Sequence, residues 1–415
     1  MKKILIGFFI ICLSSSISAN NLLTERGSFK TKLNTKKKLE DQLPIPPKEI
    51  FKIIKYRTKI GEMSAYLSQH KIKKNEKKAA IIWLTGGFPG AIPGKYLWEQ
   101  TEVSNEQSAR IYRQYGIVMM FPTLRGRVKG NSGVVERFYG EVEDVISAAE
   151  HLKSLSYIDP KRIYLGGHST GGTLALLVSE STDIFAGVIS LGPISTDYGK
   201  EGVPYQWTKK EIYFRAPINF VSYIKKPTYI IEGQSGNSSS LKEFKEIQKK
   251  STNSNIKIAS VKNANHFNVI HPVNRIFAKA ILESKKGLLN IDIKKELQPA
   301  YDIFVSEQQE SKDLRILSNL RFEGILIQGK KTMVSSFYSW DEVILKSLIR
   351  ESGKLNLNAT KITKLKNDQN KTYYGITLSK EVRIDSLKNV FMTSKHFNNL
   401  ALKHELYYNY WTLEK

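Results

Sequence analysis

Cysteine is almost absent from this chain of 415 residues, which has only Cys12, inside an N-terminal apolar stretch. The folded part therefore has no cysteine for a disulfide, a thiolate zinc site, an iron–sulfur cluster or a nucleophile. Beyond that stretch the sequence also lacks any run of about 18 apolar residues, the length that a membrane-spanning helix requires. The sequence predicts no metal site and no cofactor.

Acidic residues are also few, with 39 of them against 64 lysines and arginines, which gives a formal net charge of +25. A cationic surface attracts anionic lipid headgroups, cell-wall polymers and nucleic acids. The basic residues are spread over much of the chain, and no helix-turn-helix, zinc or aromatic RNA-binding signature accompanies them. We therefore expect no specific nucleic-acid partner, and at most a loose association with an anionic envelope surface.

The N-terminus has the pattern of a secretory signal peptide. Two lysines precede the apolar run 4–13, and small and polar residues follow over 14–20. This arrangement predicts a signal peptide over residues 1–19, cleaved after Ala19. The mature protein is then expected to be secreted or periplasmic.

The lysine-rich composition of residues 20–47 predicts a basic flexible arm that ends in a proline-rich spacer. The arm contains three consecutive lysines, Lys36 to Lys38, and the spacer is 43–47.

Short apolar runs bounded by glycine or proline alternate with helix-like segments over residues 48–286. Such runs are typical of buried strands in a parallel sheet. The alternation predicts an α/β fold with a mostly parallel sheet flanked by helices. The stretch 197–226 is rich in aromatic residues and is expected to form a cap-like insertion. Its rings either line a substrate site or bury the cap against its own domain. The main runs are 79–84, 116–121, 162–165, 186–191 and 228–231.

The character of the sequence changes after residue 286, where segments become longer and more polar. A helix is predicted to start near Asp341, and two strand-like runs flank the polar turn 367–370. Residues 287–415 are therefore expected to form a smaller C-terminal α+β domain, to which we assign no role.

The pentapeptide from Gly167 to Gly171 has the form G-x-S-x-G, with Ser169 at its centre. A predicted strand precedes it and a helix follows, and in that context the motif forms a sharp turn that exposes the serine hydroxyl. The backbone N–H of Thr170 would then face a developing oxyanion. A second donor is expected from the glycine-rich loop after the run 79–84, at Gly87 or Phe88. The alternative for that loop is a flexible turn.

A serine nucleophile requires a base, and the chain has seven histidines. In this architecture the histidine follows the last strand, which favours His266, with His271 in reserve. His168 adjoins the serine, and strand geometry points its side chain elsewhere.

Two carboxylates could orient that histidine. Glu232 ends the strand before it, and Asp197 follows the preceding strand; the sequence does not decide between them. A third possibility is that neither reaches the imidazole.

Arg125 follows the strand that ends near Pro122, on the same edge of the sheet. It either binds a substrate carboxylate or forms a structural ion pair.

Together these motifs resemble the α/β-hydrolase superfamily, and more closely its prolyl-oligopeptidase and dienelactone-hydrolase-like branch, over residues 50–282. The resemblance implies a serine nucleophile at Ser169, a histidine base at His266 and a backbone oxyanion hole. The branch has its acid where this chain has Gly236, which is a departure from the pattern. The chain has no room for the β-propeller that gates peptidases of this branch.

We therefore expect an exported serine hydrolase that cleaves an ester, or secondly a peptide or amide, through an acyl-enzyme. The alternative is a catalytically silent protein with this fold that uses its basic surface to hold an anionic partner.

Overall fold

A computed structural model describes residues 21–87, 94–99, 101–196, 199–236, 238–250, 253–284, 287–322, 328–367, 370–404, 406–408 and 410–414. The predicted signal peptide lies outside these ranges. No helix in the described part combines the length and the apolar composition needed to cross a bilayer.

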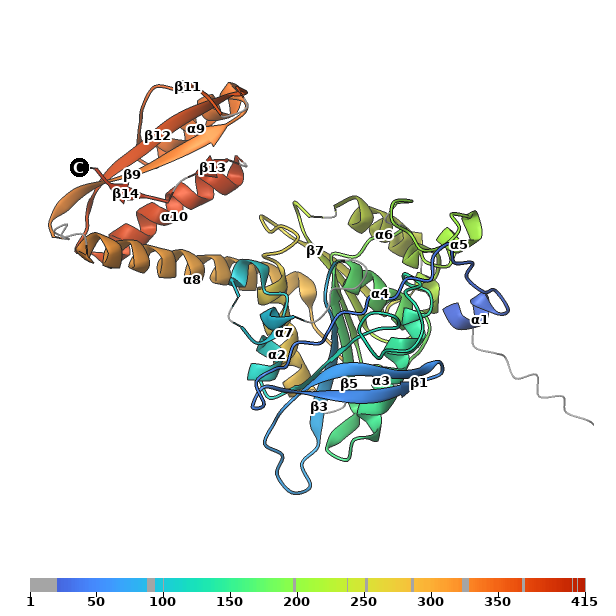
Figure 1. The fold of residues 1–415 in the computed structure, drawn as a ribbon. Helices are drawn as coiled ribbons and strands as arrows, with labels where there is room; N and C mark the ends of the chain where they lie inside the picture. The colour runs from blue at the N-terminus through green and yellow to red at the C-terminus, as the bar shows by residue number, and fades with distance from the viewer. Residues whose placement is uncertain are drawn as a thin grey trace, which may run out of the picture.

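Eight strands form one sheet in the order β1-β2-β4-β3-β5-β6-β7-β8 (Figure 1). Strand β2 is antiparallel to both β1 and β4, and the remaining pairs are parallel. This arrangement confirms the predicted α/β class. The strands are β1 Phe51–Thr58, β2 Gly61–Ser68, β3 Lys78–Leu84, β4 Val118–Pro122, β5 Ile158–His168, β6 Val188–Leu191, β7 Thr228–Gly233 and β8 Ile256–Val261.

Helices cover both faces of this sheet, because successive side chains of each buried strand point to opposite sides. On β3, Ile81 and Trp83 join the core beneath α7, whereas Ile82 and Leu84 join the core beneath α3 and α4. The parallel strands are buried on both faces, which explains their uninterrupted apolar runs. The helices are α2 Ile111–Gln114, α3 Glu141–Ser154, α4 Thr170–Ser179, α6 Ser238–Lys250 and α7 Ile270–Glu283, with short 3-10 turns at Lys95–Leu97 and Val103–Asn105.

Residues 21–47, which we call the N-terminal strap, pack against the α/β domain, and this corrects the expectation of a flexible arm. The strap starts with helix α1 (Leu22–Arg26), and Leu22 is fully buried. The guanidinium of Arg26 donates to the backbone carbonyls of Tyr139 at 2.7 Å and Phe214 at 2.8 Å. Backbone pairing at Leu33 and Asp41 continues the attachment. The many lysines favoured a flexible arm. That prediction was wrong because a few buried side chains and backbone hydrogen bonds are enough to hold the segment on the domain.

The aromatic insertion is buried against its own domain. Phe220 is fully buried, and its ring stacks on that of Phe214 with centroids 6.3 Å apart. The Arg215 guanidinium lies 3.8 Å from the centre of the Tyr205 ring and donates to the hydroxyl of Thr31 in the strap at 2.7 Å. These contacts support the second of the two sequence-based alternatives. The insertion contains α5 Lys209–Tyr213 and two 3-10 turns, Pro217–Asn219 and Val221–Tyr223.

The C-terminal region forms an antiparallel sheet with helices on one face, as the sequence predicted. The strand order is that of a ferredoxin-like βαββαβ unit. Strands β12 and β9 pair at the centre, β10 and β11 pair with β12 on one side, and β13 and β14 pair with β9 on the other. The predicted hairpin is formed by β11 and β12. The elements are β9 Lys330–Ser339, α9 Glu342–Lys354, β10 Asn358–Ala359, β11 Thr363–Lys366, β12 Thr372–Arg383, α10 Leu387–Lys403, β13 Tyr407–Tyr408 and β14 Thr412–Leu413.

A long helix, α8 (Ile293–Phe322), connects the two parts of the molecule (Figure 1). Its first half contributes Leu297 and Tyr301 to the core of the α/β domain. Its second half contributes Leu317 and Leu320 to the core of the C-terminal domain. The helix thus belongs to both cores.

Candidate active site

Ser169 lies at the turn between β5 and α4, in a strained backbone conformation with φ 54° and ψ −119°. A positive φ is unfavourable for a residue with a Cβ, so the surrounding packing must enforce it. Glycine is required on both sides. A Cβ on Gly167 would lie 2.4 Å from the carbonyl oxygen of Gly171, and a Cβ on Gly171 would lie 2.1 Å from that of Leu84. This geometry is that of a nucleophile elbow.

The loop after β3 is held against the elbow by a side chain from α4. The Thr170 hydroxyl donates to the carbonyl of Gly87 at 2.9 Å. Gly87 has φ 94°, a conformation that favours glycine. Thr170 is also the first residue of α4, where a backbone N–H has no helical carbonyl to bind. The two residues named as oxyanion donors are therefore adjacent, whereas Phe88 lies outside the described residues.

His266 and Glu232 form a buried pair at the ends of neighbouring strands. Glu232 is 1 % exposed near the end of β7, and its Oε2 lies 2.9 Å from Nδ1 of His266. Its other oxygen, Oε1, accepts the backbone N–H of Gly233 at 2.7 Å. Since a carboxylate only accepts, Nδ1 carries the proton and Nε2 is left as the basic nitrogen. The His266 side chain is 18 % exposed, so solvent reaches the ring.

The side chains of His266 and Glu232 occupy space that is free only because two neighbouring residues, Gly192 and Gly236, are glycines. A Cβ on Gly192 would lie 2.5 Å from Cε1 of His266 and 2.8 Å from Oε2 of Glu232. A Cβ on Gly236 would lie 2.4 Å from the carboxyl carbon of Glu232. The carboxylate of Glu232 thus fills the room that a side chain at position 236 would take. This explains in steric terms why the branch's usual acid position holds glycine here. Asp197, the other acid proposed from the sequence, lies outside the described residues.

The backbone brings Ser169 and His266 to the same edge of the sheet. The Ser169 N–H donates to the carbonyl of Leu191 at 2.8 Å. The residue that follows Leu191, Gly192, donates its own N–H to the carbonyl of Ile231 at 2.8 Å. Gly192 in turn contacts the His266 ring. The described structure therefore gathers Ser169, Thr170, Gly87, His266 and Glu232 at the carboxyl ends of β3, β5, β6, β7 and β8.

The reserve histidine is placed elsewhere. The ring of His271 lies on α7 with its centroid 5.6 Å from that of Phe304 in α8. Burial and the nearby Arg110 and Arg275 lower the pKa of His271 to about 4. It packs between helices and belongs to the core that joins α7 to α8.

His168, the residue before the nucleophile, is not a bystander. It points away from Ser169, as expected, but its Nε2 lies 2.8 Å from the backbone carbonyl oxygen of His266. The two imidazole rings are 4.4 Å apart between centroids. No spacing rule in the sequence indicates this contact, because it joins the end of β5 to the loop after β8, which meet only in the folded sheet.

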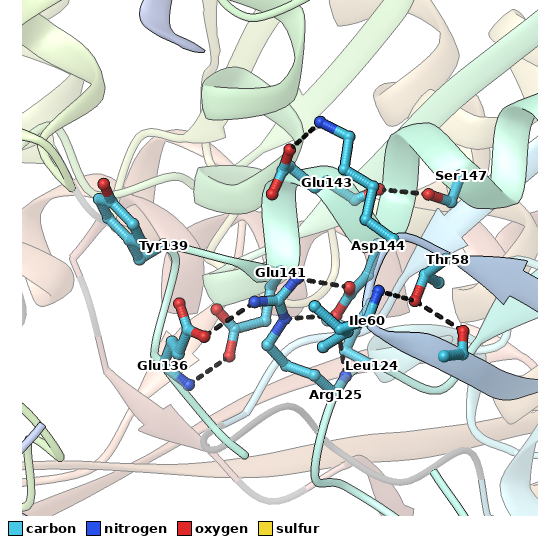
Figure 2. A network of polar contacts seen from close by, with 12 residues as sticks. Thr58, Ile60, Leu124, Arg125, Glu136, Tyr139, Glu141, Glu143, Asp144 and Ser147 are labelled. Atoms are coloured by element: carbon cyan, nitrogen blue, oxygen red, sulfur yellow. Dashed lines mark hydrogen bonds and ion pairs between the residues drawn. The ribbon is translucent and has the colours of Figure 1, made fainter. Parts of the chain in front are cut away.

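Arg125 forms an ion-pair network (Figure 2), which supports the second of its two alternatives, a structural ion pair, over substrate binding. Its Nη2 lies 2.8 Å from Oδ1 of Asp144, and its Nη1 lies 2.8 Å from Oε1 of Glu136. The residue is 5 % exposed. Burial alone would lower the pKa of Arg125, but the carboxylates of Asp144, Glu141 and Glu136 raise it above its ordinary value. The guanidinium holds the segment after β4 against the start of α3.

A small pocket lies beside the elbow, with a volume of about 50 Å³. Thr170 and Gly171 form its wall on the side of the nucleophile, and Arg127 and Arg137 contribute charged groups. An engineered cavity of about 150 Å³ binds benzene, and this pocket is smaller, so it suits a short group best. Its apolar lining is Trp83, Leu84, Phe121, Pro122, Leu124, Val135, Phe138 and Leu174. Within the described ranges, no three or more His, Cys, Asp or Glu side chains are placed to hold a metal ion.

Comparison with known proteins gives one family match. Residues 136–281 match the model of the prolyl oligopeptidase family. This segment contains the elbow, the ends of β6 and β7, and His266, so it covers most of the gathered residues. The match confirms the resemblance inferred from the motifs. Among curated proteins, none has a sequence that matches this chain.

Solved structures with a similar fold include an acylaminoacyl peptidase from Pyrococcus horikoshii, with 19 % identity and a TM-score of 0.48, over 60 % of this chain and 45 % of that one. Another is an acylaminoacyl peptidase in complex with Z-Gly-Gly-Phe-chloromethyl ketone, with 18 % identity and a TM-score of 0.46, over 60 % and 44 %. A third is an esterase from Pyrococcus furiosus, with 15 % identity and a TM-score of 0.42, over 59 % and 97 %. The chain thus spans less than half the length of the two peptidases. Each is a similarity of fold only.

Proposed function

We propose that this chain, whose residues 136–281 match the model of the prolyl oligopeptidase family, is an exported serine hydrolase with Ser169 as its nucleophile. The observation that carries the proposal is the hydrogen bond of 2.9 Å between the buried Glu232 and the partly exposed His266, beside a strained serine elbow. The strained turn at Ser169 is the geometry that presents the hydroxyl of a nucleophilic serine.

In the proposed mechanism, Nε2 of His266 takes the proton of the Ser169 hydroxyl as its oxygen attacks the substrate carbonyl. Glu232 keeps the proton on Nδ1 and stabilises the imidazolium that forms. The N–H groups of Thr170 and Gly87 bind the oxyanion. His266 then gives its proton to the leaving group, and water attacks the acyl-enzyme with His266 again as base.

We propose a small ester as the preferred substrate and a peptide or amide as the second. The pocket beside the elbow holds about 50 Å³, which suits a short acyl group such as acetyl or propionyl. Its walls are mainly apolar, so they favour a hydrocarbon chain.

The proposal of export rests on the N-terminal pattern of residues 1–19. Its test is the N-terminal sequence of the protein isolated from its native cell envelope or culture medium. A mature chain that starts at residue 20 supports export, and a retained Met1 contradicts it.

The activity is tested with p-nitrophenyl esters of increasing acyl length and with aminoacyl p-nitroanilides. Ser169→Ala should lower kcat by about a million-fold. The matched control is Ser154→Ala, at an exposed serine in the last turn of α3, which should leave kcat unchanged. Acetate and propionate esters should react faster than octanoate. A folded wild type without turnover of any of these substrates would instead support the silent binding protein.

A further inference from the structure

We infer that His168 is a positioning residue, whose ring fixes the backbone of the catalytic base by donating a hydrogen bond from Nε2 to the carbonyl of His266. The inference rests on the proposed function, since it gives His168 a task only if His266 works as a base.

The contacts of His168 define its tautomer. The residue ends β5 and is 1 % exposed, with Nε2 2.8 Å from the His266 carbonyl oxygen. A carbonyl can only accept, so the proton is on Nε2 and Nδ1 must accept. The side-chain amide of Gln107 supplies the donor, with its nitrogen 3.1 Å from Nδ1. The same amide nitrogen donates to the side-chain oxygen of Asn105 at 2.8 Å, which orients it.

The ring stays neutral across the working range of pH. Burial and the proximity of His266 lower the pKa of His168 to about 3. A neutral ring adds no repulsion when His266 becomes an imidazolium 4.4 Å away. It also keeps its tautomer, so the hydrogen bond to the carbonyl is present in every step of the cycle.

His266 lies in the loop between β8, which ends at Val261, and α7, which begins at Ile270. Glu232 holds the ring of His266 and so sets its rotation. His168 holds the backbone of the same residue and so sets its position. His168 is the direct neighbour of Ser169 in the chain, and its side chain is hydrogen-bonded to the backbone of His266. It therefore links the nucleophile to the backbone of the base.

The expected size of the effect follows from this geometry. A displacement of about 1 Å between reacting groups can lower the rate about a hundred-fold. His168 is 1 % exposed and its ring nitrogens contact Gln107 and the His266 carbonyl, so its loss should leave substrate binding intact. The predicted signature is a lower kcat at constant KM.

The experiment compares His168→Ala with His168→Gln, whose amide nitrogen can take the place of Nε2. With p-nitrophenyl acetate, the alanine variant should lose about a hundred-fold in kcat with KM unchanged. The glutamine variant should recover at least about ten-fold of this loss. The matched control is His70→Gln, at a histidine whose Nε2 contacts Ser68 on β2 at 2.8 Å, and it should keep full kcat. The acidic limb of the kcat/KM profile should keep its shape in all variants, because His168 does not titrate there.

A merely structural role would lower the melting temperature and kcat together, without rescue by glutamine, and this result overturns the inference. Full kcat in a folded alanine variant, or a loss confined to KM, also overturns it. If the alanine variant does not fold, the inference is tested by ¹⁵N NMR of the wild type, which shows which ring nitrogen of His168 carries the proton. The account requires an Nε2-protonated His168 that does not titrate between about pH 5 and 8, and an Nδ1-protonated ring contradicts it. A wild type without Ser169-dependent turnover refutes the proposed function first, and the role of His168 with it.

Discussion

A buried carboxylate in the C-terminal domain, Asp313, can be compared with the buried Glu232 of the α/β domain, because their hydrogen-bond partners differ in what they can do. In the C-terminal domain, Asp313 is fully buried, and its Oδ1 accepts from Gln309 at 3.0 Å, Ser394 at 2.7 Å and Trp411 at 2.8 Å. These donors are neutral and buried. In the α/β domain, Glu232 instead holds a titratable ring that solvent reaches.

The comparison teaches that burial of a carboxylate does not by itself mark a catalytic site. Burial raises the pKa of Asp313, and the hydrogen bonds from Trp411, Ser394 and Gln309 only partly oppose it. Asp313 therefore ties α8, α10 and the C-terminal residues together. Glu232 differs because its partner, His266, exchanges a proton with the substrate in the proposed mechanism. The predictions below separate the two roles, from the largest expected effect to the smallest.

Replacing Glu232 by glutamine should lower kcat for esters by about ten-thousand-fold, because a neutral amide no longer stabilises the imidazolium or fixes its tautomer. The corresponding change in the other domain, Asp313→Asn, should leave kcat unchanged. Ester turnover of both purified variants measures the difference. Equal activity of Glu232→Gln and the wild type would remove Glu232 from the mechanism.

The glycine at position 236 allows a sharper version of that test. In Glu232→Ala the space beside Gly236 is vacated, so an added Gly236→Asp side chain can enter it and approach His266. The double variant should recover at least about a hundred-fold of the activity that the alanine variant loses. Gly236→Asp alone should lower activity, since its side chain meets the Glu232 carboxylate. A double variant no better than Glu232→Ala would show that the space cannot host the acid.

Replacing Gly192 by alanine should lower kcat by about a hundred-fold or more, because the new Cβ would displace the His266 ring. Gly192 also has φ 58°, so backbone strain contributes. The control is Gly116→Ala, at a glycine with φ 79° and no atom within 4 Å of the added Cβ. The control carries the strain without the contact and should keep its activity. Equal losses in both variants would assign the effect to strain.

The Asp313→Ala variant should destabilise the C-terminal domain by about 3 kcal/mol, because three buried donors lose their acceptor. The measurement is denaturant unfolding followed by tryptophan fluorescence, since Trp411 is one of those donors. Ester turnover should stay at the wild-type level. A parallel loss of activity would show that the two domains act together in catalysis.

Acid should weaken the fold gradually. Burial lowers the pKa of His70 to about 4, that of His168 to about 3 and that of His271 to about 4. Unfolded histidines take up protons near pH 6.5, so the unfolded chain binds more protons than the folded one below that pH. Stability should therefore fall as the pH decreases from about 6.5 towards 4. The slope of melting temperature against pH should be smaller in His70→Gln, and an unchanged slope contradicts this account.

Much of the α/β domain could be predicted from the sequence, because buried strands and their glycine-bounded ends are local signals. The elbow at Ser169 and the loop of His266 were placed by the same signals. The acid was not decided, since the reach of Glu232 depends on the clearance at Gly192 and Gly236, which are far apart in the chain. The order of the strap was missed because its anchors, such as Arg26, bind backbone carbonyls that carry no sequence signature.

The most direct test of the central claim is the reaction of the intact protein with a fluorophosphonate, followed by peptide mass spectrometry. The account predicts a covalent adduct on Ser169 that is lost in Ser169→Ala and forms more slowly in Glu232→Gln. A folded wild type that stays unlabelled, or an adduct on another residue, would contradict it.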